Sequence, residues 1–262
     1  MARITTVTNQ KGGVGKTTTA HALAAGLAKA GYKVLQIDTD SQANLSDTAR
    51  ANPAGPGLNE LIEAAITAPA RLPQQTKKAI QHPGIDIIAA NDDLDGVELA
   101  LANAGENRAF ILRRIIEPLT AQYDHIIIDT PPTLGLMTVN ALAACDDIVI
   151  PIKAEIYALR GFAKLEETIA KAREYYNPDL CVAGLLVTMH NPRAILYRSL
   201  YEDLQRQAER LQTHIYKTYI RQGVAVGEAQ ALQQELFKYA PKSKPAADYA
   251  AFVKEYLAQE RK

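Results

Sequence analysis

One glycine-rich segment constrains the fold of this chain more than any other part of the sequence. It reads Gln10-Lys-Gly-Gly-Val-Gly-Lys-Thr-Thr-Thr, follows the β-type run Ile4–Thr8 and opens the helical run Lys16–Ala30. Its glycines allow backbone N–H groups to close around an anion, which a Cβ atom would obstruct. The helix that follows directs its positive N-terminal end at the same anion. A strand, a glycine loop and a helix in this order predict a phosphate-binding loop in an α/β fold.

The side chains of this loop match the chemistry of a bound nucleoside triphosphate. Lys16 is expected to reach the β- and γ-phosphates, and the Thr17 hydroxyl is expected to ligate Mg²⁺. Thr18 is placed to hold the α-phosphate. Lys11 stands where the common pattern has its leading glycine. The residues predicted to bind the nucleotide phosphates are therefore Gly12, Gly13, Val14, Gly15, Lys16, Thr17 and Thr18.

A second apolar run supplies a carboxylate for the metal side of such a site. The run His125–Ile128 is followed by Asp129, at the C-terminal end of a predicted buried strand. Ligands of parallel sheets bind at this end of the strands. Asp129 is therefore expected to hold a water of Mg²⁺, with Thr130 and the two prolines after it forming a rigid exit beside the γ-phosphate. The alternative role for Asp129 is to cap the next helix.

A third acidic cluster ends the second predicted strand. Asp38 and Asp40 lie two residues apart, so in an extended chain they point the same way. Asp40 is farther from the sheet and is predicted to position the attacking water, because phosphoryl transfer needs an aligned nucleophile. Asp38 is predicted to support Mg²⁺ or its waters, which makes Thr17, Asp38 and Asp129 the predicted metal set. A plain polar cap at the strand end is the alternative for both carboxylates.

Short β-type runs alternate with longer helical runs, which is typical of βαβ units around a parallel sheet. Several of the β-type runs are almost wholly apolar, as expected when helices cover both faces. We expect one doubly wound α/β domain over residues 1–262, with a mostly parallel sheet and a turn-rich loop at residues 52–57. The predicted strands are Ile4–Thr8, Val34–Ile37, Ile85–Ile88, His125–Ile128, Ile148–Ile152 and Val182–Thr188. The predicted helices are Lys16–Ala30, Leu58–Ile66, Arg108–Gln122, Leu134–Ala143, Leu159–Tyr175 and Ile195–Leu211.

Composition excludes several classes of protein. The 29 basic residues balance 29 acidic ones, so no chain-wide basic field predicts a nucleic-acid partner. Residues 193–262 hold 12 of the basic and 8 of the acidic residues, which makes this part mildly basic. Cys145 and Cys181 lie beside apolar runs without metal-ligand spacing and are predicted to be buried thiols. With no signal peptide and no apolar run of membrane-spanning length, we expect a cytoplasmic protein.

Together these segments resemble the ParA/Soj/MinD group of deviant Walker A ATPases, and ParA-like partition proteins most of all. Lys11–Thr18 matches the family P-loop, Asp38–Gln42 its D-x-D-P-Q motif, and Ile128–Pro132 its Walker B segment. Ile150–Gly161 resembles the segment after the next strand, and Leu185–Arg193 resembles the stretch that lines the base. The resemblance covers nearly the whole chain and weakens over its last 70 residues.

The resemblance implies an ATPase that uses ATP and Mg²⁺ and dimerises around two ATP molecules. Lys11 would cross to the phosphates of the partner subunit, so Lys11, Lys16 and Asp40 would carry catalysis. Met189 and Pro192 would line the adenine, and the preference for adenine rests on the resemblance. Such proteins bind DNA without sequence preference in their ATP state. A ParB-like centromere-binding or adaptor protein stimulates hydrolysis and releases them, so we expect DNA partition on the nucleoid and no membrane contact.

The sequence departs from the family pattern in two places. Ser41 replaces the proline of the D-x-D-P-Q motif. Near the C-terminus Arg221 keeps one family arginine, but the second arginine position holds Ala225 or Val226, so the family's DNA contact is not carried over. Each basic residue nearby is either a DNA contact or a plain surface charge. These DNA candidates are Lys217, Arg221, Lys238, Lys242 and Lys244.

Three other functions fit parts of the sequence. A MinD-like membrane switch would use the amphipathic tail, but its mixed polar side favours a helix that closes the fold against the core. A metabolic P-loop enzyme would need a substrate domain, and none is visible. A scaffold that hardly hydrolyses ATP is opposed by the intact Lys11, Lys16, Asp40 and Asp129. The apolar stripe of the tail consists of Tyr249, Phe252, Val253, Tyr256 and Leu257.

Overall fold

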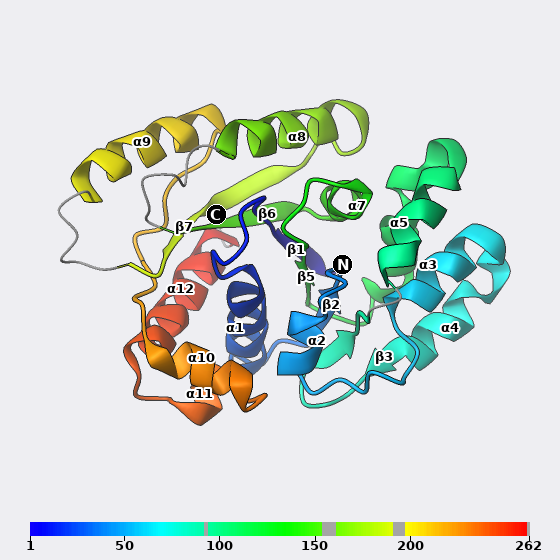
Figure 1. The fold of residues 1–262 in the computed structure, drawn as a ribbon, viewed down its shortest axis with the longest axis horizontal. Helices are drawn as coiled ribbons and strands as arrows, with labels where there is room; N and C mark the ends of the chain where they lie inside the picture. The colour runs from blue at the N-terminus through cyan, green and yellow to red at the C-terminus, as the bar shows by residue number, and fades with distance from the viewer. Residues whose placement is uncertain (92–93, 154–160, 191–196, 261–262) are drawn as a thin grey trace.

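A seven-stranded sheet forms the centre of the computed structural model, which describes residues 1–91, 94–153, 161–190 and 197–260. The strand order is β3-β4-β2-β5-β1-β6-β7, and every neighbouring pair is parallel except β3 with β4 (Figure 1). The doubly wound fold is thereby confirmed, and the six predicted strands are correct to within one residue at each end. The strands are β1 (Arg3–Val7), β2 (Val34–Asp38), β3 (Ile80–Gln81), β4 (Asp86–Ile88), β5 (His125–Asp129), β6 (Asp147–Lys153) and β7 (Cys181–Thr188).

The predicted helices occur in the predicted order with one correction, and the predicted starts at Leu159 and Ile195 lie outside the described residues. The predicted helix Arg108–Gln122 is wrong as a single element, because it divides into two short 3₁₀ turns, Gly105–Ala109 and Glu117–Leu119, around α6 (Ile111–Ile116). Pro118 has no N–H to donate to the carbonyl of Arg114, so the α-helical hydrogen bonds end there and the chain continues as a 3₁₀ turn. The other helices are α1 (Lys16–Lys29), α2 (Asn44–Thr48), α3 (Leu58–Thr67), α4 (Leu72–Ala79), α5 (Leu94–Asn103), α7 (Leu136–Ala144), α8 (Phe162–Tyr175), α9 (Tyr197–Arg210), α10 (Val224–Ala231), α11 (Leu236–Tyr239) and α12 (Lys244–Glu260). The sequence did not predict α2, α4, α5, α10 and α11.

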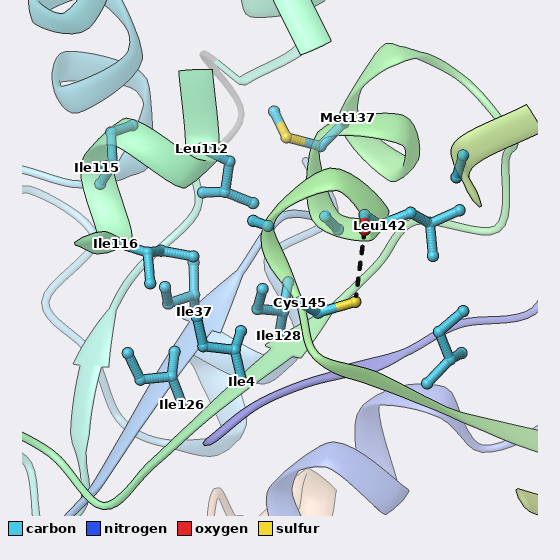
Figure 2. Close-up of a cluster of buried hydrophobic side chains, with 14 of the residues drawn as sticks. Ile4, Ile37, Leu112, Ile115, Ile116, Ile126, Ile128, Met137, Leu142 and Cys145 are labelled. Atoms are coloured by element: carbon cyan, nitrogen blue, oxygen red, sulfur yellow. Dashed lines mark hydrogen bonds between the residues drawn. The ribbon is translucent and has the colours of Figure 1, made fainter. Parts of the chain in front are cut away.

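Alternate residues of the strands bury their side chains in two separate clusters, one on each face of the sheet. Ile126 and Ile128 of β5 belong to the first cluster, to which helices α3 to α9 contribute. Ile127, between them, belongs to the second, which α1, α10, α11 and α12 cover. Figure 2 shows part of the first cluster, where Ile115 and Ile116 of α6 lie over isoleucines of β2 and β5. Burial on both faces explains why the strand sequences are almost wholly apolar.

The two cysteines differ in exposure, which corrects half of the prediction. Cys145 is buried, and its Sγ lies 3.8 Å from the carbonyl oxygen of Leu142 (Figure 2). Burial raises the pKa of the Cys145 thiol. The predicted burial of Cys181 is wrong, because Cys181 opens the edge strand β7 with its side chain exposed. An apolar run that follows a cysteine does not show on which side of the strand its first residue lies.

The C-terminal helix closes the second cluster, as the mixed polar face of the tail predicted. Tyr249, Phe252, Val253 and Tyr256 of α12 are buried against α1 and the sheet, and Leu257 is partly buried. The Tyr256 hydroxyl lies 2.7 Å from Thr5 Oγ1. The apolar stripe is therefore used in the core. Within the described residues, no helix is both long and apolar enough to cross a membrane.

Gly26 lies where α12 comes closest to α1, and its replacement tests this packing. A Cβ atom on Gly26 would lie 2.5 Å from Val253 Cγ2. We expect Gly26→Ala to lower the free energy of unfolding by about 1–2 kcal/mol, because overpacking outweighs the gain in helix propensity. Gly96→Ala in α5 is the matched control, since no atom lies within 4 Å of its Cβ position. That change is expected to raise stability by about 0.5–1 kcal/mol in urea unfolding. Unchanged stability of Gly26→Ala would contradict the close α1–α12 contact.

Candidate nucleotide site

Three neighbouring strands bring the predicted site residues to one edge of the sheet. β5 lies between β2 and β1, and Asp129 is the register partner of both Asp38 and Val7. The glycine loop leaves β1 at this edge, and Asp38 and Asp129 end β2 and β5 there. All three strands run parallel, so their carboxyl ends share the edge where such sheets bind ligands.

The backbone of the glycine loop is held in place by side chains around it. Gly13 and Gly15 have φ angles of 69° and 85°, a left-handed conformation that glycine adopts without strain. Thr188 Oγ1 donates a hydrogen bond of 2.7 Å to the Val14 carbonyl, and the Lys11 N–H donates one of 3.0 Å to Asn9 Oδ1. The loop therefore presents its N–H groups and the N-terminus of α1 from a fixed geometry.

Lys16 places its ammonium group inside the loop. The side chain is buried, and its Nζ donates a hydrogen bond of 3.3 Å to the Lys11 carbonyl. Burial lowers the pKa of Lys16, while the nearby Asp129 and Asp40 carboxylates oppose that shift. A buried cation between a glycine loop and carboxylates is suited to bind phosphate oxygens through charge-assisted hydrogen bonds.

Asp129 is fully buried and has unused hydrogen-bonding capacity. Neither carboxylate oxygen makes a well-formed hydrogen bond to another described residue, although the Thr17 hydroxyl lies close enough to lower its pKa. Burial, reinforced by the charge of Asp38, raises the pKa of Asp129 well above its usual value. Buried orphaned carboxylate oxygens beside a hydroxyl are oxygen donors of the kind that Mg²⁺ prefers. No cluster of three or more acidic, His or Cys side chains surrounds a metal position in the described chain, so phosphate and water would complete the shell.

Asp38 has its oxygens occupied by protein groups. Oδ1 accepts from the Asp40 N–H at 3.1 Å, and Oδ2 accepts from both the N–H and the hydroxyl of Ser46 at 2.8 Å. The Ser46 Oγ in turn accepts from the Ala90 N–H at 2.9 Å, which ties α2 to the end of β4. Burial raises the pKa of Asp38 to about 6. Its support of Mg²⁺ stays a prediction, and its visible action is to anchor the segment that carries Asp40.

Asp40 lies in the turn between β2 and α2. Its side chain is 7 % exposed, and Oδ1 accepts a hydrogen bond of 3.1 Å from the Gln42 N–H. The charge of Asp40 acts on both Lys16 and Asp129, which places it beside the predicted phosphate and metal positions. The role of Asp40 in aligning water stays a prediction. We name residues 40–48, from Asp40 through α2, the switch segment.

The C-terminal part of the chain also reaches the nucleotide site. Met189, half-buried with a φ of 50°, follows β7, while Pro192 lies outside the described residues. Gln230 Nε2 of α10 donates a hydrogen bond of 3.0 Å to Thr18 Oγ1. Sequence reasoning missed the contributions of Gln230, Ser46 and Thr188, because each contacts a residue far from it in the sequence, and only folding brings the two together.

The predicted DNA candidates are not equivalent in the structure. Arg221 is engaged with Asp248 through two hydrogen bonds, Nε to Oδ2 at 2.8 Å and Nη2 to Oδ1 at 2.5 Å. Lys217 uses its backbone N–H to bind Glu255 Oε1 and has an exposed side chain. Lys238, on α11, is exposed, and its Nζ lies 3.7 Å from Glu235 Oε2. Two further exposed lysines follow, one just before α12 and one as its first residue. These two are Lys242 and Lys244.

Comparison with known proteins places this site in a family. The model of the AAA domain matches residues 2–182. The chromosome partitioning protein ParA of Myxococcus xanthus is 36% identical over 264 residues, which cover 99% of this chain and 89% of that protein. The chain belongs to the ParA/Soj family of P-loop ATPases. The sporulation initiation inhibitor protein Soj of Bacillus subtilis is likewise 36% identical, covering 98% of this chain and 99% of Soj.

Solved structures extend the likeness beyond the partition proteins of the ParA/Soj family. Cobyrinic acid a,c-diamide synthase from Mycobacterium smegmatis, with bound ADP and magnesium, superimposes with a TM-score of 0.82 at 29% identity. The match covers 100% of this chain and 96% of that protein. A protein with a different named activity thus shares this architecture, so function has to be argued from site residues rather than from fold.

Proposed function

We propose that this ParA/Soj-family chain binds ATP with Mg²⁺, dimerises around it, and acts as a hydrolysis-timed switch of DNA partition or cargo positioning. The observation that carries the proposal is a second lysine, Lys11, on a phosphate loop that already holds Lys16. One cation suffices to bind phosphates within a subunit. A second cation at the mouth of the loop is suited to neutralise charge across a dimer interface, which ties association to ATP.

The site residues divide the work of hydrolysis between them. The loop N–H groups and Lys16 hold the phosphates, while Thr17 and Asp129 would hold Mg²⁺ and its waters. When bound, the metal neutralises the charge that develops on the β- and γ-phosphates. Asp40 orients the attacking water, and Asp38 keeps the switch segment in position through Ser46. Hydrolysis of ATP then lets the two subunits separate, because the phosphates had joined them.

Lys11→Ala tests the proposed contact across the dimer. The variant is expected to bind ATP with unchanged affinity and to raise the dimer dissociation constant at least about tenfold, the effect of one lost charge-assisted hydrogen bond. Light scattering with ATP and with ADP measures association, and calorimetry measures nucleotide affinity. Lys33→Ala, at an exposed lysine after α1, is the matched control. A normal ATP-dependent dimer of Lys11→Ala would contradict the role of Lys11.

Asp40→Ala tests the alignment of water. The variant is expected to bind ATP and dimerise, while its hydrolysis rate falls at least about 100-fold, the usual effect of losing a group that activates the nucleophile. Asp47→Ala, at an exposed carboxylate in the same switch segment, is the control. Phosphate release under saturating ATP measures turnover, and a rate equal to wild type would remove Asp40 from the mechanism.

The DNA part of the proposal rests on the exposed lysines of α11 and the start of α12. Arg221 is less suited to the contact, since Asp248 neutralises it. Asp40→Ala traps the ATP state, so its binding to random-sequence duplex DNA at two salt concentrations is the deciding experiment. Salt-sensitive binding with ATP and none with ADP supports the proposal, because phosphate contacts release counterions. The triple change Lys238→Ala, Lys242→Ala and Lys244→Ala should then weaken binding, whereas Lys217→Ala should weaken it less.

A MinD-like membrane switch is the second candidate function. It would need an apolar stripe available to lipid, and four of the five stripe residues of α12 are buried in the core. Cosedimentation of the ATP-bound Asp40→Ala dimer with anionic vesicles separates the two functions. Binding to vesicles without binding to DNA would favour the membrane function over partition.

A further inference from the structure

The core fixes little of α10, the helix that precedes the exposed lysines of α11 and α12. Figure 1 shows α10 and α11 beside α1. Of the eight residues of α10, all of which the structure describes, only Ala229 is buried, while Ala225 and Val226 are partly buried. A cavity of about 250 Å³ is lined by residues 48–50 on one side and by the turn after α10 on another. With so little buried surface, the position of α10 depends on the polar contacts of its C-terminal end.

The first of these contacts joins α10 to the start of α1. Gln230 Nε2 donates a hydrogen bond of 3.0 Å to Thr18 Oγ1. Thr18 is predicted to hold the α-phosphate, and because its oxygen accepts from Gln230, its own proton stays available for the phosphate. A hydroxyl that donates becomes a stronger acceptor, since hydrogen bonds in a chain polarise one another. Bound nucleotide is therefore expected to strengthen the bond between Thr18 and α10.

The second contact joins α10 to the residues that follow the switch segment. Arg50 Nε donates a hydrogen bond of 2.7 Å to the Gln233 carbonyl, and Arg50 Nη2 donates one of 3.2 Å to the Leu232 carbonyl. Leu232 is the C-cap residue of α10, so the guanidinium meets carbonyls at the negative end of the helix. A cation from a distant part of the chain therefore caps α10.

Arg50 is joined to the switch segment through the backbone. It follows α2 after a single residue, and the N–H of Ala51 donates a hydrogen bond of 2.9 Å to the Ser46 carbonyl. Ser46 in turn bonds the Asp38 carboxylate at the end of β2. Residues 46–51 thus form one hydrogen-bonded turn, so a movement of α2 also moves the group that caps α10.

The helix α11 is tied to α10, so it follows any movement of that helix. The Tyr239 hydroxyl donates a hydrogen bond of 3.1 Å to Glu228 Oε2, from α11 back to α10. In the turn between the two helices, the N–H of Gln234 donates to the Ala229 carbonyl at 2.8 Å. A change at the end of α10 therefore reaches the exposed lysines beyond it. We name these lysines the basic surface, which consists of Lys238, Lys242 and Lys244.

We propose that α10 couples the nucleotide site to the basic surface through two positioning residues, Gln230 and Arg50. Gln230 responds to the phosphate loop, and Arg50 responds to the switch segment. ADP engages the first contact through Thr18, whereas ATP also places its γ-phosphate beside the switch segment and engages both. The effect on DNA binding rests on the proposed function, but the response of α10 to nucleotide does not require DNA.

Amide hydrogen exchange of the full-length chain tests this coupling without DNA. The N–H groups of Leu232, Gln233 and Gln234 donate to carbonyls of α10 at 3.0, 2.9 and 2.8 Å, so their exchange requires the end of the helix to open. Saturating ADP with Mg²⁺ should slow this exchange at least about fivefold, and a non-hydrolysable ATP analogue should slow it about fivefold further. Exchange that is unchanged by both nucleotides would overturn the proposal.

Substitutions separate the two contacts in the same experiment. Arg50→Ala should keep the response to ADP and lose the further response to the ATP analogue, whereas Gln230→Ala should lose the response to ADP. Arg71→Ala, at an exposed arginine before α4, is the matched control for Arg50→Ala and should respond as wild type. A wild-type response of Arg50→Ala would contradict its role. Light scattering of the same samples checks that Arg50→Ala dimerises as wild type; loss of the dimer would assign Arg50 to the subunit contact instead and overturn the proposal.

DNA binding with the same nucleotides separates this coupling from the proposed function. Arg50→Ala should lower the ratio of DNA affinity with the ATP analogue to DNA affinity with ADP at least about fivefold at constant salt. An unchanged ratio would contradict coupling through Arg50. If the wild-type protein binds no DNA with the analogue, the partition function is refuted, and hydrogen exchange alone decides whether α10 responds to nucleotide.

Discussion

Lys16→Ala is expected to weaken ATP binding by about 100-fold or more. The Lys16 ammonium is buried inside the glycine loop, where its pKa is lowered by burial and where Asp129 and Asp40 lie near. Its charge-assisted hydrogen bonds to two phosphates contribute about 3 kcal/mol together, which corresponds to that loss of affinity. Isothermal titration calorimetry with ATP and Mg²⁺ measures the change directly.

The control for Lys16→Ala is Lys29→Ala, an exposed lysine at the other end of α1. It removes the same charge from the same helix and should leave ATP affinity unchanged. Loss of affinity in both variants would show that net charge, rather than position in the loop, governs binding. Unchanged affinity of Lys16→Ala would refute the phosphate role of this residue.

Asp129→Asn is expected to stabilise the nucleotide-free protein while impairing its use of Mg²⁺. The charges of Asp38 and Asp40 oppose ionisation of Asp129 and only that of Lys16 favours it, while the Asp129 oxygens have no well-formed partner in the described chain. Replacing a buried, uncompensated carboxylate by a neutral amide of the same shape should raise the free energy of unfolding by about 1–3 kcal/mol at pH 8. Urea unfolding in EDTA measures this gain.

The pH dependence of folding stability shows in which direction ionisation of Asp129 acts. Burial raises the pKa of Asp129 well above its usual value and that of Asp38 to about 6, so the folded state holds these protons more tightly than the unfolded state. The stability they contribute is fully present below the unfolded pKa of about 4 and is lost as the pH rises through the folded values. The advantage of Asp129→Asn over wild type should therefore be small at pH 4 and grow towards pH 8.

Two comparisons check this interpretation. Asp47→Asn changes an exposed carboxylate in α2 and should leave the pH profile as in wild type. Saturating ATP with Mg²⁺ should stabilise the wild-type protein more than Asp129→Asn, because a ligand stabilises the state that binds it. If Asp129→Asn were less stable than wild type at pH 8 without Mg²⁺, neighbouring groups of the protein would already stabilise the Asp129 carboxylate, and the interpretation would be wrong.

The sequence by itself determined the elements that carry the nucleotide chemistry. Apolar runs with an Asp at the end, as in β2 and β5, read as buried strands because helices cover both faces of a parallel sheet. The glycine spacing of residues 12–15 requires backbone conformations that the structure shows at Gly13 and Gly15. The glycine loop and the buried strands depend mainly on residues that are neighbours in the sequence. Both can therefore be predicted without knowing the tertiary structure.

Tertiary structure alone decided how those elements act on one another. Strand order places Asp129 between β1 and β2, and no local pattern encodes the neighbours of a strand. The same holds for Ser46, which occupies the Asp38 carboxylate, for Asp248, which neutralises Arg221, and for the side of β7 on which Cys181 lies. These contacts join residues that packing brings together across the chain, whereas spacing in the sequence reports only the geometry within one helix, strand or turn.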